Sequence, residues 1–427
     1  MRRLLIFIIT ILTANILHAQ NPCDRMGISN GWMLNMDESE IDQITAACAM
    51  TNTLYFRSDF AWSDVQWEGS ESWNWSNIDR VVSSSNKEGL ALIAILDYFP
   101  PWASVSTDTT FWYDFVYQAG LRYIPQGVVI YEIWNEPNIT NFWPEPNVQD
   151  YVQNILIPGS NAIRKAASDL NTSVTVISGG LAPAATDGNN ISQLDFVQGI
   201  YDNGGKNHFD ALGQHPYCWP LDPSIPNTFN WFLNTEQLRN IMIKNGDGHK
   251  KIWGTEMGWP TSNPNSNGVS ESDQARFLSS SYGLWNNWDW TGPLIWYAYN
   301  DAGTNFENPE DNFGLVRNDF SSKVALDSFL MLSSNCSDNI VGSSEFESND
   351  HSLKVFPNPV SKELNINGLD LTSKVSIFNI SGILVQEAFP SSENLSLNLA
   401  FFPNGIYFIK VVKEDEKVLL VKRLVKK

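Results

Sequence analysis

Two glutamates follow apolar segments at positions where paired carboxyl groups could do chemistry. Glu136 comes soon after the apolar run 127–131, and Glu256 follows the segment 252–255. An apolar run that stops abruptly at polar residues is typical of a buried parallel strand. Two carboxyl groups held on rigid elements can act on one bond, since one protonates the leaving oxygen while the other attacks carbon or activates water. The two glutamates therefore predict hydrolytic acid–base or nucleophilic chemistry.

The elements that must position these glutamates alternate between strands and helices from residue 25 to about 330. The predicted strands are Arg25–Ile28, Thr53–Arg57, Ala91–Leu96, Val128–Trp134, Val174–Ser178, Ala211–His215, Lys251–Thr255 and Pro293–Tyr297. The predicted helices are Glu38–Ala49, Trp75–Glu88, Thr110–Arg122, Val148–Asp169, Leu194–Asp202, Glu236–Lys244 and Glu271–Trp285. This alternation predicts an α/β fold, a (β/α)8 TIM barrel, with the two glutamates after strands four and seven. A doubly wound open sheet is the alternative, but no glycine-rich phosphate-binding fingerprint follows the first strand.

The segments around both glutamates resemble those of clan A glycoside hydrolases, with families 39 and 5 nearest. The resemblance lies in Trp134-Asn135-Glu136-Pro137 and in Trp253-Gly254-Thr255-Glu256, and it spans residues 25–330. Supporting segments are Phe56–Trp62, Ser178–Pro183 and Phe209–Tyr217. The resemblance implies that Glu136 is the acid/base and Glu256 the nucleophile, with retention of configuration.

The same resemblance implies roles for other residues near the glutamates. Arg57 would keep Glu256 ionised, because an adjacent cation lowers the pKa of a carboxyl group. Asn135 would bond to a sugar hydroxyl. His215 and Tyr217 would tune the nucleophile and contact the sugar. Trp296, near the end of strand eight, would be the platform under the cleaved sugar.

Further polar and aromatic residues lie in or near the predicted loops at the barrel mouth. Asp97 ends strand three and could bind a sugar hydroxyl or cap a turn. Trp62 and Trp259 are candidate sugar platforms that could equally be packing residues, as are Trp102 and Trp143. We expect Glu132, which shares the inward face of strand four with Glu136 by alternation, to pair with a cation inside the barrel, such as Arg57.

The chain after the barrel changes its pattern. Residues 336–351 are polar and predict a linker, and short apolar strands separated by turn signals in 352–427 predict a small all-β sandwich. The segments Val355–Val360, Val375–Gly382, Pro403–Val411 and Lys422–Lys427 resemble the type A sorting domain of the type IX secretion system. This resemblance implies contact with that secretion machinery and export from a Gram-negative bacterium, secreted or on the outer cell surface. A carbohydrate-binding sandwich is the alternative, but this region contains no Trp.

Composition limits the function classes. The net charge is −20, and residues 21–351 alone carry −25, which argues against nucleic acid as a partner. Residues 1–19 have the charged start, apolar segment and small-residue exit of a signal peptide, with a membrane anchor as the alternative. The barrel domain would then occupy residues 20–335.

Metal and cofactor chemistry are not predicted. The chain has 5 His and no HExxH or CxxC spacing, so we expect no metal and no cofactor. No GxSxG motif indicates a serine esterase. The cysteines are Cys23, Cys48, Cys218 and Cys336; Cys23 with Cys48 is the pair nearest in sequence, although spacing alone does not fix the pairing.

We therefore expect a secreted, monomeric retaining glycosidase acting on β-linked polysaccharide or oligosaccharide. The many Trp around the mouth favour an extended cleft and endo action. An exo-acting β-xylosidase and a non-catalytic carbohydrate-binding barrel are the alternatives.

Overall fold

The structure is a computed structural model that describes residues 23–334, 346–347, 353–379, 384–402, 405–413 and 418–426. The predicted signal peptide and most of the predicted linker lie outside these residues. Within the described ranges, no helix has the length and apolar character needed to cross a membrane.

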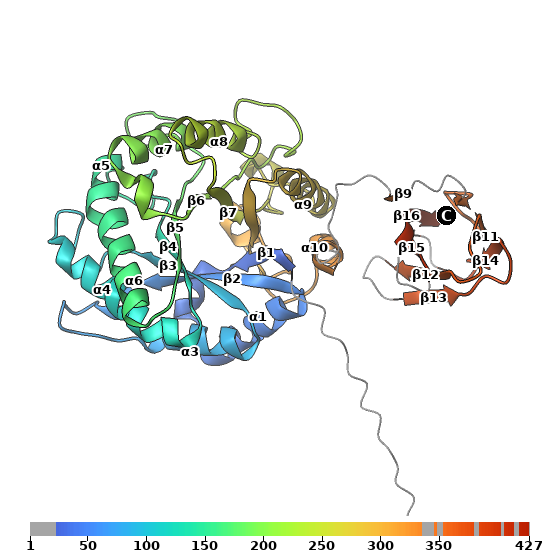
Figure 1. The fold of residues 1–427 in the computed structure, drawn as a ribbon, viewed down its shortest axis with the longest axis horizontal. Coiled ribbons are helices and arrows are strands. Elements are labelled where there is room, and N and C mark those ends of the chain that lie inside the picture. Colours follow the sequence, from blue (N-terminus) through green and yellow to red (C-terminus); the bar gives the residue numbers. More distant parts are fainter. Residues whose placement is uncertain are drawn as a thin grey trace, which may run out of the picture.

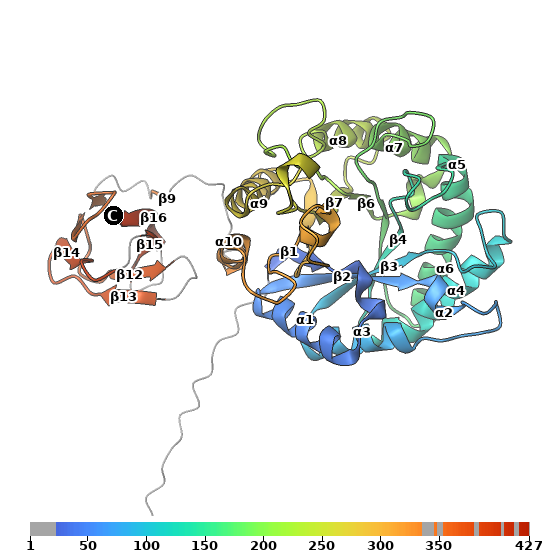
Figure 2. The same cartoon turned by 180° about the vertical axis from the view of Figure 1, so that it is seen from behind.

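Eight parallel strands form a closed barrel in chain order, as predicted. They are β1 (Cys23–Ser29), β2 (Thr53–Ala61), β3 (Ala91–Asp97), β4 (Ile130–Asn135), β5 (Thr175–Gly180), β6 (Ala211–Gln214), β7 (Lys251–Met257) and β8 (Thr291–Tyr297). The barrel closes where β1 pairs with β8, from Met26 opposite Leu294 to Ser29 opposite Tyr297. The strands lie in the middle and the helices surround them (Figures 1 and 2).

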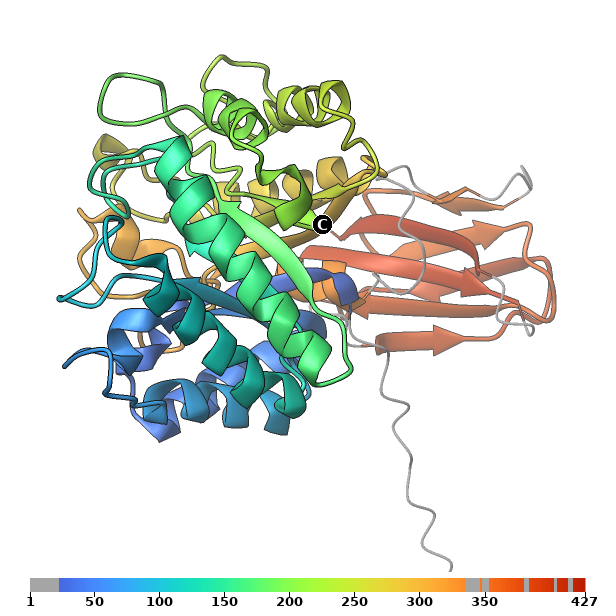
Figure 3. The same cartoon turned by 60° about the vertical axis from the view of Figure 1, so that its left-hand side comes forward.

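The helices follow the predicted segments closely. They are α1 (Glu38–Met50), α2 (Trp62–Val65), α3 (Ser76–Lys87), α4 (Thr109–Tyr123), α5 (Val148–Asp150), α6 (Ile157–Asp169), α7 (Gln193–Asp202), α8 (Thr235–Lys244), α9 (Glu271–Asn286) and α10 (Val324–Ser334). The short α2 and the final α10 were not predicted. A π-helical turn, Tyr151–Leu156, joins α5 to α6, and Pro158 beside it has no N–H for the regular helical ladder. Figure 3 shows α4 (teal) beside α6 (green) along the barrel wall.

Two apolar layers hold the barrel together. Inside it, Ile93, Ile177, Ala211 and Ile295 form a buried cluster. Outside it, a much larger buried cluster fills the space between the strands and the helices. The two layers follow from strand geometry, because successive side chains point to opposite faces.

The C-terminal strands form two antiparallel sheets with their own buried cluster. One sheet contains β10 (Lys354–Phe356), β11 (Glu363–Asn367) and β14 (Asn394–Asn398). The other contains β13 (Leu384–Ala388), β12 (Lys374–Asn379), β15 (Gly405–Val412), β16 (Val418–Lys426) and β9 (Phe346–Glu347). The sandwich prediction is confirmed, although β13 was missed and β9 lies within the predicted linker.

The cysteines differ from the pairing considered above. Cys23 is disulfide-bonded, whereas Cys48 and Cys218 are free and buried. A bond between Cys23 and Cys48 is therefore wrong. Cys336 lies outside the described residues.

The barrel interior gives a first prediction. Replacing Ile177 with Ala should lower the free energy of unfolding by about 2–5 kcal/mol, because the closed cluster cannot collapse into the cavity. The matched control is Ile243→Ala on α8, where the side chain is 54% exposed and we expect a change within about 0.5 kcal/mol. Denaturation followed by Trp fluorescence reports on the barrel alone, since all 17 Trp lie between Trp32 and Trp296. Equal losses in the two variants would contradict this account of the core.

Candidate active site

Arg57 lies at the centre of the barrel mouth, with no exposed side-chain surface. Its Nε donates to Glu132 Oε2 at 2.7 Å, and its Nη2 donates to Asn135 Oδ1 at 3.0 Å. Its Nη1 donates to Glu256 Oε1 and, at 3.3 Å, to Ser29 Oγ. Burial alone would lower the pKa of Arg57, but Glu132 and Glu256 more than offset it and the pKa is raised. Arg57 is therefore a permanent cation that connects its own strand, β2, with residues of β1, β4 and β7.

Glu132 has the structural role that the sequence predicted. Besides Arg57, its carboxylate accepts from the Gly180 N–H and from Thr255 Oγ1, both at 2.8 Å. The side chain has no exposed surface. A buried carboxylate with three donors is satisfied, so Glu132 holds the barrel mouth together rather than facing a substrate.

The end of β4 departs from regular strand geometry. Trp134 has φ +77° and Glu136 has φ +46°, values that residues other than glycine rarely adopt. Trp134 packs outward against Phe99 and Trp112. Asn135 and Glu136 both reach the mouth, where alternation alone would have sent Trp134 inward with Glu132. Backbone outliers of this kind concentrate at functional sites.

Glu136 is largely buried. Its side chain is 11% exposed, and its Oε1 is 2.7 Å from His215 Nδ1. Burial raises the pKa of Glu136 to about 8, with Arg57 opposing and Glu132 adding to the shift. The carboxyl group therefore keeps its proton at neutral pH.

Glu256 has a different environment from Glu136. Its Oε1 accepts from Arg57, and its Oε2 accepts from the Tyr217 hydroxyl at 2.9 Å. The side chain is 13% exposed. Both oxygens of the Glu256 carboxyl group are thus held by donors, one a cation and one a hydroxyl.

His215 lies between the two glutamates. Its Nε2 is 3.4 Å from Arg57 Nη2, and because a guanidinium can only donate, Nε2 must be the unprotonated nitrogen. Nδ1–H then donates to Glu136. Burial lowers the pKa of His215 to about 4, so the ring is neutral at pH 5–8. Gly180 makes room for the ring, since a Cβ there would overlap it.

These contacts bring six of the predicted residues together: Glu136, Glu256, Arg57, Asn135, His215 and Tyr217. An oxygen of each glutamate and a nitrogen of His215 lie within 4.8 Å of one another. Such a triad could in principle ligate a metal ion. The Arg57 guanidinium already lies on Glu256, however, and its positive charge disfavours a second cation there.

Trp296 is not the predicted platform. It has no exposed surface and stacks outward on Trp259, with ring centroids 6.1 Å apart. Its neighbour Ile295 points into the barrel, so alternation sends Trp296 out and Tyr297 in. The Tyr297 ring contacts Tyr217, and its hydroxyl pKa is raised by burial and by charges that include Glu256. Tyr297 was not among the predicted site residues, although strict alternation from Ile295 would have placed its side chain inside the barrel mouth.

The other proposed sugar contacts are also buried. Trp62 is 1% exposed under the β2 loop, and Trp259 is 0% exposed, with its Nε1 donating to Leu221 O at 2.9 Å. Trp143 is 2% exposed, and Trp102 is half-buried with its Nε1 donating to Gln66 O. The platform role of Trp62 and Trp259 is therefore wrong. Their rings fill the space around the strand ends.

Asp97 is buried as well, so the expectation that it binds a sugar hydroxyl is wrong. It has no exposed surface, and neither carboxyl oxygen has a hydrogen-bond partner among the described residues. Burial raises its pKa well above the ordinary value, and the charge of Asp59 adds to the shift. Burial likewise raises the pKa of Asp59 itself, to about 7. Asp59, half-buried on β2, is a further carboxyl group of the mouth that the sequence did not single out.

Arg57 gives a second prediction. Arg57→Met should cost about 3–5 kcal/mol of unfolding free energy, because it leaves Glu132 and Glu256 without their cation. Adding Glu132→Gln should recover part of the loss. The control Arg164→Met removes a surface ion pair with Asp210 and should cost at most about 1 kcal/mol. Similar losses at both arginines, measured by denaturation, would show that Arg57 is not a central support.

Comparison with known proteins identifies the family of the C-terminal part of the chain and shows which solved structures share the fold of the barrel. Residues 354–427 match the family described as the secretion system C-terminal sorting domain. This domain directs a chain through the type IX secretion machinery, so the protein is exported to the cell surface or released. No curated protein matches the chain.

Solved structures of glycoside hydrolases share the barrel fold. A family 39 glycoside hydrolase from the gut symbiont Bacteroides cellulosilyticus WH2 is 19% identical, with a TM-score of 0.58 over 96% of this chain and 82% of that one. A glucosidase from Croceicoccus marinus is 12% identical, with a TM-score of 0.62 over 89% and 94%. A GH5_18 protein from Bifidobacterium longum subsp. infantis is 12% identical, with a TM-score of 0.54 over 74% and 79%. The chain thus combines a barrel of the kind found in clan A glycoside hydrolases of families 39 and 5 with a secretion sorting domain.

Proposed function

We propose that residues 20–335 form a retaining glycoside hydrolase that cleaves β-linked polysaccharide or oligosaccharide. One observation carries the proposal. Glu136 and Glu256 lie close together, yet one carboxyl group is kept protonated by burial while the other is held by Arg57 and Tyr217. Glycoside cleavage requires one carboxyl group that gives up a proton and a second that attacks carbon, and the different surroundings of Glu136 and Glu256 suit these two roles.

In the first step, Glu256 attacks the anomeric carbon while Glu136 gives its proton to the glycosidic oxygen. The C–O bond breaks, the leaving sugar departs with that proton, and the remaining sugar is bound covalently to Glu256. In the second step, Glu136 takes a proton from water, the water oxygen attacks the same carbon, and Glu256 leaves. The Nδ1–H of His215 stabilises Glu136 while it is a carboxylate.

The spacing of the carboxyl groups supports retention. Their near oxygens lie within 4.8 Å. Retaining enzymes separate the two groups by about 5–5.5 Å, whereas inverting enzymes need about 6.5–9.5 Å to admit water between them. The proposed nucleophile can therefore reach the sugar directly.

Charge in the barrel mouth supports a neutral sugar at the cleavage site. Arg57 is the central cation, and it is already engaged by Glu132 and Glu256. Asp59 and Asp97 add further carboxyl groups nearby. A uronic acid or sulfated sugar would bring negative charge to a site with no free cation among these groups.

Endo and exo cleavage can be distinguished by their products. Trp62, Trp143, Trp259 and Trp296 are buried, so they do not form the exposed aromatic rim that would favour endo action. Endo action is instead favoured because an exported enzyme would meet polymeric substrates. Release of a ladder of oligosaccharides would support it, whereas release of single xylose units would support an exo-acting β-xylosidase.

Substitution of the glutamates tests the function. Glu256→Ala should reduce reducing-end release by at least about 10³-fold, and Glu136→Gln by about 10²–10⁴-fold. The substrates are xylans, β-glucans, mannans and bacterial exopolysaccharides, and the control is Glu38→Gln, an exposed glutamate on α1. Polysaccharide binding without hydrolysis by any of these proteins would instead support a non-catalytic binding barrel.

The pKa of Glu136 gives a prediction for pH. Because the acid must be protonated, kcat/KM should fall as the pH rises through about 8. Aryl glycosides with good leaving groups need less protonation, so Glu136→Gln should retain more activity on them and should lack this alkaline limb. A limb that persists unchanged in Glu136→Gln would assign the titration to another group.

A further inference from the structure

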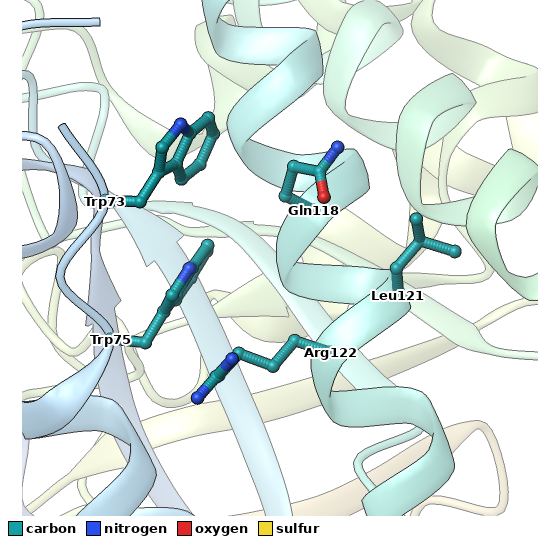
Figure 4. A pocket seen from close by; sticks show the side chains of 5 residues that line it. All are labelled: Trp73, Trp75, Gln118, Leu121 and Arg122. Carbon is teal, nitrogen blue, oxygen red and sulfur yellow. The ribbon is translucent and has the colours of Figure 1, made fainter. Parts of the chain in front are cut away.

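An open pocket of about 510 Å³ lies on the outer wall of the barrel, between the start of α3 and the outer face of α4. Trp73 and Trp75 form one wall, and Gln118, Leu121 and Arg122 of α4 form the other (Figure 4). None of these residues belongs to the group around Arg57. Pockets of this size bind small ligands or segments of larger ones.

Packing explains Trp75 but not Trp73. The Trp75 ring stacks on Phe115 at a centroid distance of 5.9 Å and meets Tyr123 edge-on at 5.7 Å, so it belongs to the core. Trp73 is 40% exposed and stacks on Trp75, with centroids 5.6 Å apart and planes 19° apart. Its indole N–H has no protein partner among the described residues. The rings thus extend a stack from the core to the surface and end on an open aromatic face.

The facing wall supplies polar groups but little free charge. Arg122 donates to Asp79 through Nε at 2.8 Å and Nη2 at 2.6 Å, which balances its charge. Gln118 is exposed and can both donate and accept. An anionic ligand would find its countercharge already used by Asp79.

We propose that this pocket is a second glycan-binding site, which holds a neutral segment of the polysaccharide outside the barrel mouth. A pyranose ring presents C–H bonds on one face and hydroxyls at its edge. The C–H bonds carry partial positive charge and pack on the negative face of an indole, while the hydroxyls bond to amide and guanidinium groups. Trp73 provides the first surface, and Gln118 with Arg122 provides the second.

The inference rests on the proposed function for the identity of its ligand, and it predicts different effects on different substrates. Trp73 touches no group of the catalytic site. Its loss should therefore leave the turnover of small soluble glycosides unchanged and should slow the hydrolysis of insoluble polymer, where the second contact raises the local concentration of chain.

The test measures depletion of protein by insoluble xylan, mannan and β-glucan, in the Glu256→Ala background so that the polymer stays intact. Trp73→Ala should weaken binding to at least one polymer by about tenfold. Trp73→Phe should keep most of the affinity, because it retains an aromatic face. The matched control is Trp67→Ala, which removes a 65% exposed Trp from the same loop but outside the pocket, and it should change binding by less than about twofold.

The outcomes separate this proposal from the proposed function. Equal binding by the Trp73→Ala and Trp67→Ala proteins, or no binding to any of the three polymers, would overturn the second site, whether or not the protein with Glu256 intact hydrolyses them. Trp73-dependent binding without hydrolysis would keep the site and reject the glycosidase. Trp73-dependent self-association in sedimentation, with no polymer binding, would assign the pocket to a second copy of the chain and also overturn the proposal.

Discussion

The barrel mouth depends on one buried cation. Arg57 takes its place on β2, but its hydrogen bonds reach Ser29 on β1, Glu132 and Asn135 on β4, and Glu256 on β7. A charge with no exposed surface is tolerated only when it is paired and fully bonded. A shift of register in any of these strands would leave charges unpaired. The requirement to satisfy Arg57 therefore fixes the relative heights of strands that are distant in sequence, and the two glutamates are placed by the same constraint.

Much of this arrangement could be predicted from the sequence. All eight barrel strands were located, because most of them are apolar runs that end at a polar residue or a turn. Glu136, Glu256 and the pairing of Glu132 with Arg57 followed from strand ends and alternation. Alternation along β4 does not, however, account for the position of Glu136. The left-handed backbone at Trp134 turns one large ring out of the mouth and brings Asn135 and Glu136 in together, and no pattern in the sequence marked that irregularity.

The aromatic residues were harder to predict, for a physical reason. An indole ring has a large apolar area and one N–H, so it suits both a sugar platform and the space between a strand and a helix. Trp62, Trp259 and Trp296 lie close in sequence to catalytic segments, yet each is buried beneath the surface. Proximity in sequence to the mouth does not distinguish the inward face of a strand from its outward face. At β8, a difference of one residue in the alternation decides whether Trp296 or Tyr297 faces the barrel interior.

The carboxyl groups of the mouth also connect the site with the energetics of folding. Asp59 and Glu136 have ordinary pKa values of 3.8 and 4.5, and burial raises them to about 7 and about 8. The native state therefore binds protons that the unfolded chain has released at neutral pH, so folding takes up protons. The contribution of these groups to stability declines as the pH rises from their unfolded pKa values to their folded ones. Mild acid thus favours the folded barrel at these positions, and the proton needed for catalysis is acquired when the chain folds.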